Sequence, residues 1–536
     1  MQLPRTSTLT WTIPDKLLIF YSKILIWFRF LSEYSVIGIA FLFSIFGWKY
    51  YFDLGLVLSY NDSMSHLDIS RRIVENLTPG IAQIGSVWLP LPHLLSLPFI
   101  WSNFLWHTGL AGSIISNIAF VGSAYFIFKL LRGLTKDYLA AILGVLIFVV
   151  NPNMVYMQSI PMTESLLIFF FIATVYYIFQ WQRTDDIKSL IMAGFFTLFS
   201  TLTRYDGWML LAQMFVVIAV IAYQYGGLKK LESRLILFLS VATFGIILWV
   251  IWNYLIFGDP LYFINGPFSA KAQQLVFEAE GRLFAKGNFL YSTFVYILAV
   301  IKNNGSLMTF IGGIGLVLYF FKNKFSKESL SISLLLSPLI FNVAALYLGH
   351  SIINLPDIPP YTLFNVRYGL MMLPAIAVFI AYLSKKQRLI QIVFLVLLIA
   401  QTFYMYKDND VITVRDGISG ASAQGMKETG KWLGDHAKEG KVLIAASSQD
   451  SLIFQSGLPM SRFIHEGNAD IWNVSLERPT TYATWVAMHR GDLVYRKLAD
   501  NTNFLNNYEK VYDGGFTDIY KISRNVAKPL TTNDLP

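Results

Sequence analysis

Apolar segments long enough to cross a lipid bilayer recur along the chain, and they constrain the fold more than any other feature. A transmembrane helix needs about 20 mostly apolar residues. Such segments lie at about 35–58, 110–131, 138–150, 162–181, 190–202, 208–223, 235–257, 306–321, 330–348, 368–383 and 389–406. Hydrophobic residues make up 55% of the chain and charged residues only 14%, which excludes an ordinary soluble protein. The sequence therefore predicts a polytopic α-helical membrane protein with about 11 transmembrane helices.

Lysine and arginine residues gather in alternate loops, and this pattern sets the expected orientation in the cell membrane. The five basic loops contain Arg132 and Lys136; Arg183 and Lys188; Lys229, Lys230 and Arg234; Lys322, Lys324 and Lys327; and Lys385, Lys386 and Arg388. Basic loops favour the cytoplasmic side, so the opposite side, with residues 59–93, 151–161, 258–304, 350–367 and the C-terminus, should be extracytoplasmic. The net charge of +9 therefore reflects membrane orientation, and we expect no nucleic-acid partner.

Composition divides the chain into three parts. Residues 1–31 form a cytoplasmic or interfacial N-terminus, because basic and aromatic residues interrupt the apolar run 17–30. Residues 32–406 are the transmembrane domain, in which the apolar segment 288–300 should lie flat on the outer surface. Residues 407–536 have the composition of a soluble domain. A helical pattern at 424–436, strands at 441–446 and 485–488 and a hairpin at 510–522 predict an extracytoplasmic α/β domain.

The first extracytoplasmic loop, residues 59–93, interrupts the apolar chain with acids, two adjacent arginines and two histidines. Ionisable residues at a membrane, placed on a loop of a rigid scaffold, are typical of a reaction centre. A helix from residue 61 onward would place Asp62 and His66 on one face, with Arg72 at its flank. Transfer of a sugar to a hydroxyl requires a carboxylate to accept the proton and a cation to hold the departing phosphate, and Asp62 and Arg72 are candidates for these two roles. The alternative is that Asp62 caps the helix and that its charged neighbours form ordinary helical ion pairs.

Three further polar groups lie where spans begin on the same side. Glu164 starts an apolar span, so it is either a catalytic acid or a complement to the helix dipole behind an N-cap at Thr163. Arg204 lies two residues before Asp206 in a tight turn, and the two residues belong either to a site or to a surface ion pair. Arg367 either binds an anionic headgroup bidentately or anchors the chain at the interface together with Tyr368.

Taken together, these features resemble the C-type glycosyltransferase superfamily (GT-C), in particular the branch with the protein O-mannosyltransferases and the lipid A aminoarabinose transferases. The resemblance covers most of residues 32–406. It is carried by Asn61-Asp62 with the helix to Arg72, the Trp88-Leu89-Pro90-Leu91-Pro92-His93 end of the first loop, Glu164, Arg367-Tyr368 and the soluble C-terminal domain. The chain departs from the branch in having Asp62-Ser63 where an Asp-Glu pair is frequent.

The resemblance implies an inverting transfer, at the outer leaflet, from a polyprenyl-phosphate sugar donor to a hydroxyl of a glycan, lipid or protein acceptor. With the residues above, it predicts Asp62 and Glu164 as catalytic, Arg72, Arg204 and Arg367 as ligands of the donor phosphate, and a substrate pocket that includes His66, Trp88, His93 and Tyr368. Some relatives use a divalent metal ion, and the sequence identifies no ligand set for one.

Other functions are compatible with the same pattern. The alternatives are a transporter or flippase for a lipid-linked sugar, an O-antigen-ligase-like oligosaccharide transferase, and a catalytically silent scaffold whose C-terminal domain binds a partner. The sequence lacks paired spans broken by glycine or proline in two similar halves, which argues against a transporter. It also lacks the Trp-Trp-Asp signature of oligosaccharyltransferases, and it contains no cysteine for thiol chemistry or disulfides.

Overall fold

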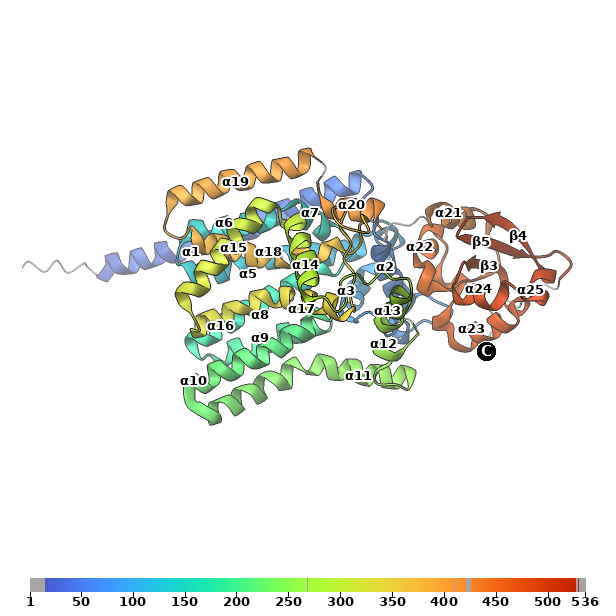
Figure 1. The fold of residues 1–536 in the computed structure, drawn as a ribbon, viewed down its shortest axis with the longest axis horizontal. Helices are drawn as coiled ribbons and strands as arrows, with labels where there is room; N and C mark the ends of the chain where they lie inside the picture. Colours follow the sequence, from blue (N-terminus) through green and yellow to red (C-terminus); the bar gives the residue numbers. More distant parts are fainter. Residues whose placement is uncertain (1–14, 268, 409, 421–425, 527–528, 530–536) are drawn as a thin grey trace, which may run out of the picture.

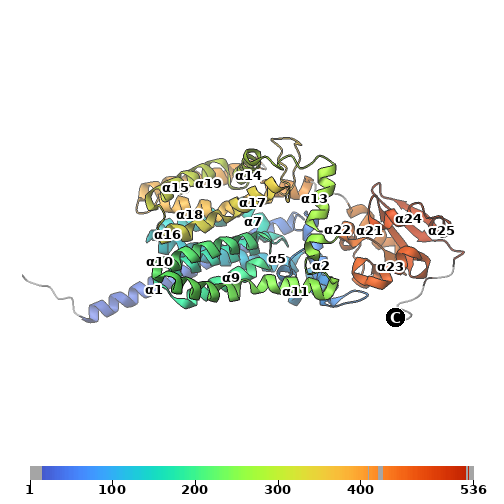
Figure 2. The same cartoon turned by 60° about the horizontal axis from the view of Figure 1, so that its bottom comes forward.

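The computed structural model describes residues 15–267, 269–408, 410–420, 426–526 and 529, with side chains described from residue 33 onward. A long bundle of helices makes up most of the molecule, and a small α/β domain lies at one end of it (Figures 1 and 2). The predicted fold class, a polytopic α-helical membrane protein with a C-terminal α/β domain, is confirmed. Of the predicted N-terminal part, residues 1–14 lie outside the described residues, and the helix that begins at Asp15 continues into the first span.

The bundle consists of α1 (Asp15–Asp53), α5 (Leu110–Thr135), α6 (Tyr138–Val149), α7 (Pro152–Ser159), α8 (Glu164–Thr184), α9 (Ile187–Thr201), α10 (Asp206–Ala242), α11 (Phe244–Phe257), α14 (Phe289–Asn304), α15 (Ser306–Asn323), α16 (Lys327–Ser333), η2 (Leu334–Leu336), α17 (Ser337–Leu348), η3 (Val366–Met372), α18 (Leu373–Leu383), α19 (Arg388–Lys407) and α20 (Ile412–Ser419). Short helices between these are α2 (Asn61–Val74), η1 (Ile81–Ile84), α3 (Leu91–Ile100), α4 (Asn103–His107), α12 (Tyr262–Asn265) and α13 (Ala270–Ala279).

Within the described residues, eight helices are long and apolar enough to cross a membrane, or up to ten if each of two bent helix pairs counts as one span. The sequence predicted one crossing more, at 190–202, and this segment is α9. With 15 residues, α9 is roughly 22 Å long at 1.5 Å per residue, whereas the hydrocarbon core is about 30 Å thick. It packs inside the bundle between α8 and α10.

Helix α10 changes direction in the middle. Gly226 and Gly227 have non-helical backbone angles, and Gly227 has a φ of 65°, a conformation that glycine adopts without strain. The break lies directly before Lys229, so one of the predicted basic loops coincides with this turn between two spans.

Helix α14 contains the predicted surface segment 288–300. It runs across the long axis of the bundle rather than along it (Figure 1), and its 16 residues do not form a candidate span. One side of α14 is buried against η3 and α17. The helix therefore supports the end of the bundle that faces the C-terminal domain.

The C-terminal domain contains a five-stranded sheet in the order β2-β1-β3-β5-β4. Its strands are β1 (Lys441–Leu443), β2 (Phe463–Ile464), β3 (Ala483–His489), β4 (Tyr508–Asp513) and β5 (Thr517–Ile522), and its helices are α21 (Lys427–His436), α22 (Ala446–Ser456), η5 (Met460–Arg462), η6 (Glu466–Asn468), α23 (Ala469–Glu477), η7 (Pro479–Thr481), α24 (Leu493–Leu498) and α25 (Thr502–Asn507). β1 pairs in parallel with β2 and β3, while β5 pairs antiparallel with β3 and β4. The expected strands and the expected hairpin are thus present, and the predicted helix 424–436 corresponds to α21, with residues 424 and 425 outside the described residues.

The first loop lies between the bundle and the C-terminal domain. Met64 and Leu67 of α2 and Trp106 of α4 share one apolar core with Leu452 and Phe454 of α22. Burial of these large side chains holds the domain onto α2, since each fully buried aliphatic or aromatic side chain contributes about 1.5–3 kcal/mol. The polar side of α2 is left to face the ends of the membrane helices.

Candidate active site

Arg367 joins the first loop to the membrane bundle through two carboxylates. Its Nη2 donates a hydrogen bond to Asp62 Oδ2 at 2.6 Å, and its Nε donates to Glu164 Oε1 at 2.9 Å. Its side chain is only 4% exposed, so these are buried, charge-assisted hydrogen bonds. Three of the predicted site residues, from α2, α8 and η3, are therefore brought together.

Arg204 extends this cluster. Its Nη1 donates to the same Glu164 oxygen at 3.1 Å and to Thr163 Oγ1 at 3.2 Å, and its Nε donates to Asp206 Oδ2 at 3.1 Å. Opposite charges therefore alternate along Asp62, Arg367, Glu164, Arg204 and Asp206, which we call the charged cluster. Alternation of this kind compensates for the desolvation of each charge.

Aromatic rings cover the two guanidinium groups. Arg204 lies 4.9 Å and Arg367 lies 5.3 Å from the centroid of the Tyr368 ring. The Tyr60 ring lies 5.1 Å from Arg367, and its hydroxyl donates to Asp416 Oδ2 at 3.1 Å. These cation–π contacts keep water from the arginines and fix the planes of their guanidinium groups.

Local backbone geometry explains the position of Arg367. Asn365 has a φ of 54°, in the left-handed region that asparagine tolerates better than most residues, and it turns the chain into η3. Side chains of α14 then bind the carbonyl groups of η3: Asn303 Nδ2 donates to Val366 O at 2.6 Å and Asn304 Nδ2 donates to Gly369 O at 3.0 Å. Gly369 itself allows the close approach, because a Cβ there would lie 2.3 Å from Ala299 O.

A tight turn between α9 and α10 places Arg204. Gly207 packs directly on the end of α9, where a Cβ would lie 2.4 Å from the carbonyl carbon and oxygen of Ser200. The turn therefore needs glycine at this position, and it directs Arg204 toward Glu164 at the start of α8.

Exposure separates the two acids predicted to be catalytic. The Asp62 side chain is 33% exposed, whereas that of Glu164 is fully buried. Glu164 Oε2 and Arg367 Nη1 are buried and have no hydrogen-bond partner within the described structure. Unpaired buried polar atoms are costly, so these two atoms mark a place where a polar ligand or water would be bound.

The contacts of these residues differ from those expected of a helix cap or a surface ion pair. Asp62 makes no capping hydrogen bond in α2, and Thr163 makes none in α8. Arg204 and Asp206, at 17% and 11% exposure, are not a surface pair. Ordinary helical pairing is present only nearby, between Arg71 and Glu75.

His66, Trp88 and His93 form one cluster beside the arginines. His66 Nδ1 and His93 Nε2 share a hydrogen bond of 2.9 Å, and the His66 ring lies 4.3 Å from the ring of Trp88. Burial, together with the charges of Arg204 and Arg367, lowers the pKa of His66 to about 3. Burial also lowers the pKa of His93, with smaller effects from His66 and Arg72. Both imidazoles are therefore neutral at physiological pH.

Arg72 is the predicted phosphate ligand that does not join the charged cluster. Its Nη1 contacts Asp450 Oδ1 of α22 at 3.4 Å, across the boundary to the C-terminal domain. The reason is geometric: Arg72 lies in the last turn of α2, ten residues after Asp62, on the part of the helix that α22 covers.

Sequence patterns missed some residues of the site. Tyr60 lies inside the first loop, and only its packing identifies it. The sequence names Asp206 beside Arg204 without giving it a separate role, and its burial argues against a surface ion pair. Asp416 and Asp450 lie in stretches of mixed composition, where no spacing distinguishes them from surface acids.

The residues of the charged cluster do not fit a divalent metal ion. Each of its three carboxylates is bonded to an arginine. A search of the described residues finds no group of three histidine, cysteine, aspartate or glutamate side chains that could hold a metal. A metal site needs several such oxygen or nitrogen ligands converging on one point.

A small, largely apolar cavity adjoins the cluster. Asp206, Ser200 and Ser337 provide polar atoms in its wall, and the rest of the lining is Leu167, Ile168, Phe171, Leu210, Pro338 and Met371. Apolar side chains therefore lie next to Asp206 of the charged cluster.

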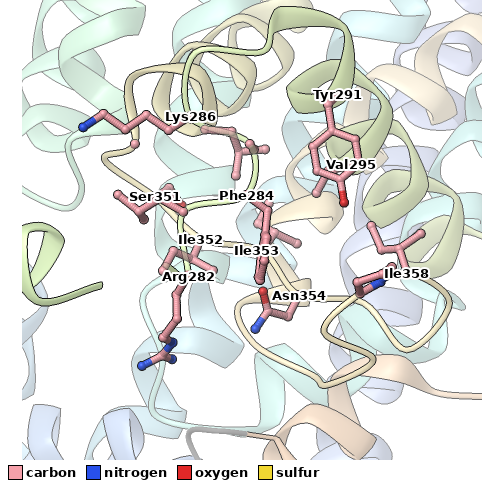
Figure 3. Close-up of a pocket in the computed structure, with 15 residues that line it drawn as sticks. Arg282, Phe284, Lys286, Tyr291, Val295, Ser351, Ile352, Ile353, Asn354 and Ile358 are labelled. Carbon is pink, nitrogen blue, oxygen red and sulfur yellow. The ribbon is translucent and has the colours of Figure 1, made fainter. Parts of the chain in front are cut away.

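A different cavity lies between the α13–α14 connection and the loop after α17. Figure 3 shows Tyr291, Ile353 and Asn354 around it, with Arg282 and Lys286 also in its wall. Both cations are bonded to acids of α13 and its C-terminal end, Arg282 to Glu280 and Lys286 to Glu278. This cavity contains none of the charged-cluster residues, so its size alone does not make it the active site.

Comparisons with known proteins give a structural match only. No family model and no curated protein matches the chain. The crystal structure of ArnT from Cupriavidus metallidurans bound to undecaprenyl phosphate is similar over 92% of this chain and 99% of that chain, with a TM-score of 0.55 and 12% sequence identity. The oligosaccharyltransferase AglB from Archaeoglobus fulgidus, in complex with an inhibitory peptide and a dolichol-phosphate, covers 95% of this chain and 75% of its own, with a TM-score of 0.46 and 11% identity.

The similarity to ArnT extends over nearly the full length of both chains, including the bundle and the C-terminal domain. At this identity it establishes the arrangement of the helices and not the chemistry. The predicted resemblance is thereby confirmed for the architecture: the chain has the fold of that ArnT structure.

Proposed function

We propose that this protein is a membrane glycosyltransferase that moves a sugar from a polyprenyl-phosphate donor to an acceptor hydroxyl on the extracytoplasmic side, with inversion at the anomeric carbon. The charged cluster carries this proposal. It joins an accessible carboxylate to a buried arginine, Arg367, and a partly buried one, Arg204, at the end of a membrane bundle, which is the combination that phosphate departure and proton acceptance require.

The donor class follows from the surroundings of the cluster. A polyprenyl chain is too apolar to leave the bilayer, so its phosphate must meet the protein at the interface. The cavity beside Asp206 and Ser200 supplies an apolar wall next to the arginines. The ArnT structure with a similar fold contains undecaprenyl phosphate, which supports a lipid phosphate as the ligand here.

Arg367 and Arg204 would hold the donor phosphate. Guanidinium groups bind phosphate oxygens bidentately, and Arg367 Nη1 has a buried hydrogen that is not used. The phosphate competes with Asp62 for Arg367, because Asp62 is the most exposed partner of this arginine. Donor binding therefore releases the Asp62 carboxylate toward the acceptor.

In the transfer step, Asp62 accepts the proton of the acceptor hydroxyl while the acceptor oxygen bonds to the anomeric carbon. The bond between that carbon and the phosphate oxygen breaks, and the polyprenyl phosphate leaves with the electron pair, stabilised by the two arginines. Attack opposite the leaving group inverts the configuration. The acceptor is a hydroxyl of a glycan, a lipid or a protein.

Glu164 orients the two arginines in this scheme. One of its oxygens accepts from both guanidinium groups, so it fixes the distance between them. His66, Trp88 and His93 form a neutral wall beside the arginines, suited to stacking and hydrogen bonding with a sugar. Tyr368 covers the arginines from the other side. No step of this scheme passes through a metal ion.

The first test is the identity of the lipid bound to the purified protein. Mass spectrometry of the copurifying lipids should detect a polyprenyl phosphate, with or without a sugar. Recovery of ordinary phospholipids alone would argue against the proposed donor.

The second test is Asp62→Asn, which preserves shape but removes the basic carboxylate. We expect transfer from a polyprenyl-phosphate sugar to fall by about 10²–10⁴, the usual contribution of general base catalysis. Asp53→Asn is the control, because Asp53 forms only an exposed pair with Lys49. Equal transfer rates in the two variants would remove Asp62 as the base.

A further inference from the structure

Two adjacent arginines of α2 differ sharply in how their donors are used. Arg71 donates to Glu75, to the carbonyls of Ile100 and Trp101, and to Asn103. It is therefore a structural link to α3 and α4. Among the described residues, Arg72 has one hydrogen bond, to Asp450 at 3.4 Å, and its Nε is buried without a partner there. Arg72 therefore has unused N–H donors that could bind an anion.

Asp450 holds Arg72 from the C-terminal domain. The two side chains are 12% and 14% exposed, so their attraction is weakly screened by solvent. Asp68, buried on α2, lies close enough to interact with both charges.

The hydrogen-bonded pair of His66 and His93 lies near both Arg72 and the arginines of the charged cluster. The charge of Arg72 affects the pKa of His93, and the charges of Arg204 and Arg367 affect that of His66. Along α2, Asp62 of the charged cluster precedes His66 by four residues and Arg72 follows it by six, so the hydrogen-bonded histidine pair lies between them along the helix.

The charged cluster has a net negative charge, and a third cation would help to neutralise it when a phosphate binds. Asp62, Glu164 and Asp206 outweigh Arg204 and Arg367 by one negative charge. A donor phosphate adds a further negative charge, and this charge grows when the phosphate departs. Burial of that excess is unfavourable unless another cation is near, and Arg72, 12% exposed, lies on the same helix as Asp62 and His66.

We infer that Asp450 positions Arg72 as a third arginine of the lipid-phosphate site, so that the C-terminal domain supplies a positioning residue to the active site. The inference rests on the proposed function and adds a partner for the phosphate that lies outside the charged cluster. Arg72 contacts the phosphate, and Asp450 acts through Arg72.

Binding of undecaprenyl phosphate to the full-length protein in detergent tests this inference without knowledge of the sugar or the acceptor. The variants are Arg72→Ala, Asp450→Asn, Asp450→Glu and the double variant Arg72→Ala/Asp450→Asn, with Kd measured by native mass spectrometry. Loss of one charge-assisted contact should raise Kd about tenfold or more in Asp450→Asn. Asp450→Glu should restore most of the affinity.

The double variant separates positioning from a structural role. If Asp450 acts through Arg72, the substitution Asp450→Asn has no further effect in the Arg72→Ala background. Asn468→Ala is the matched control, because Asn468 bonds Asn76 and Thr78 across the same interface without contacting Arg72. Its Kd should equal that of the wild type.

Two results would overturn the inference while leaving the proposed function intact: unchanged affinity in Asp450→Asn, or an equal loss of affinity in both backgrounds. A wild-type protein that does not bind undecaprenyl phosphate would overturn both proposals. The Asp62→Asn transfer assay fails or succeeds independently of the Asp450 measurements.

Discussion

At the scale of single residues, Glu164 decides whether the two buried arginines can coexist. Its one oxygen accepts hydrogen bonds from Arg204 and Arg367, which would otherwise repel each other in a medium of low dielectric constant. A fully buried acid at the start of a membrane helix is stable only because both cations surround it.

The substitution Glu164→Gln should therefore reduce stability as well as transfer. The amide keeps one acceptor but no charge, so we expect a loss of about 1–3 kcal/mol, the cost of a weakened buried charged hydrogen bond. Thermal unfolding in detergent measures this loss. Glu278→Gln, at an exposed pair with Lys286, should leave the unfolding temperature unchanged. Equal unfolding temperatures in the two variants would contradict the orienting role of Glu164.

His465 gives the C-terminal domain a dependence on pH. Its Nδ1 accepts from the backbone N–H of Gly467 at 3.1 Å, which requires a neutral imidazole. Burial, with a smaller effect from Arg72, lowers the pKa of His465. Below pH 6.5 the unfolded chain binds a proton that the folded chain does not, so stability falls as pH falls.

His465→Asn should remove this dependence. Relative to the variant, the wild type should lose about 1.4 kcal/mol between pH 7.5 and pH 5.5, because the unfolded imidazole goes from about one-tenth to about nine-tenths protonated over that range while the folded one stays neutral. Other titrating groups are shared by the two proteins and largely cancel in the difference. Parallel stability curves for the two proteins across this range would show that His465 is protonated in the folded state.

At the scale of elements, the contact between η3 and α14 positions Arg367. Gly369→Ala would place a methyl group 2.3 Å from the backbone oxygen of Ala299, and this backbone cannot yield as a side chain can. Overpacking of this kind typically costs about 1–3 kcal/mol. We expect lower thermal stability and weaker binding of undecaprenyl phosphate.

Gly313→Ala is the control for this substitution. A Cβ at Gly313 meets no atom within 4 Å, and the residue lies inside α15. Alanine favours a helix more than glycine does, so stability should stay the same or rise slightly. A Gly369→Ala protein as stable as Gly313→Ala would mean that η3 can move freely on α14.

The sequence predicts the helices and strands better than it predicts the contacts between them. Long apolar runs and turn glycines predict most of the bundle and the hairpin of β4 and β5, because hydrophobic periodicity and turn residues are local signals. The bounds of α9 are predicted to within three residues, but its prediction as a membrane crossing is not supported, because the helix has only 15 residues. Polar residues at span ends identify Asp62, Glu164, Arg204 and Arg367, but their pairing is a property of tertiary packing. The partner of Arg72 lies in another domain, and no local pattern could reveal it.

At the scale of the whole molecule, the proposal places the C-terminal domain and the active site on the extracytoplasmic side. The chain contains no cysteine, so a single introduced cysteine is an unambiguous reporter. Lys497→Cys in the C-terminal domain should react with a membrane-impermeant maleimide in intact cells. Lys229→Cys, in a basic turn, should react only after permeabilisation. The opposite labelling pattern would place the site in the cytoplasm.

The separation of the paired residues along the chain has a consequence for biosynthesis. Asp62 and Arg367 are 305 positions apart, and a ribosome that adds about 5–20 residues per second needs roughly 15–60 s to cover that distance. For this period the nascent protein exposes an acidic loop whose cationic partner has not been translated. Chains that terminate before η3 would never acquire Arg367, so their Asp62 would stay without this partner. Membrane quality control could distinguish them from complete chains by this difference.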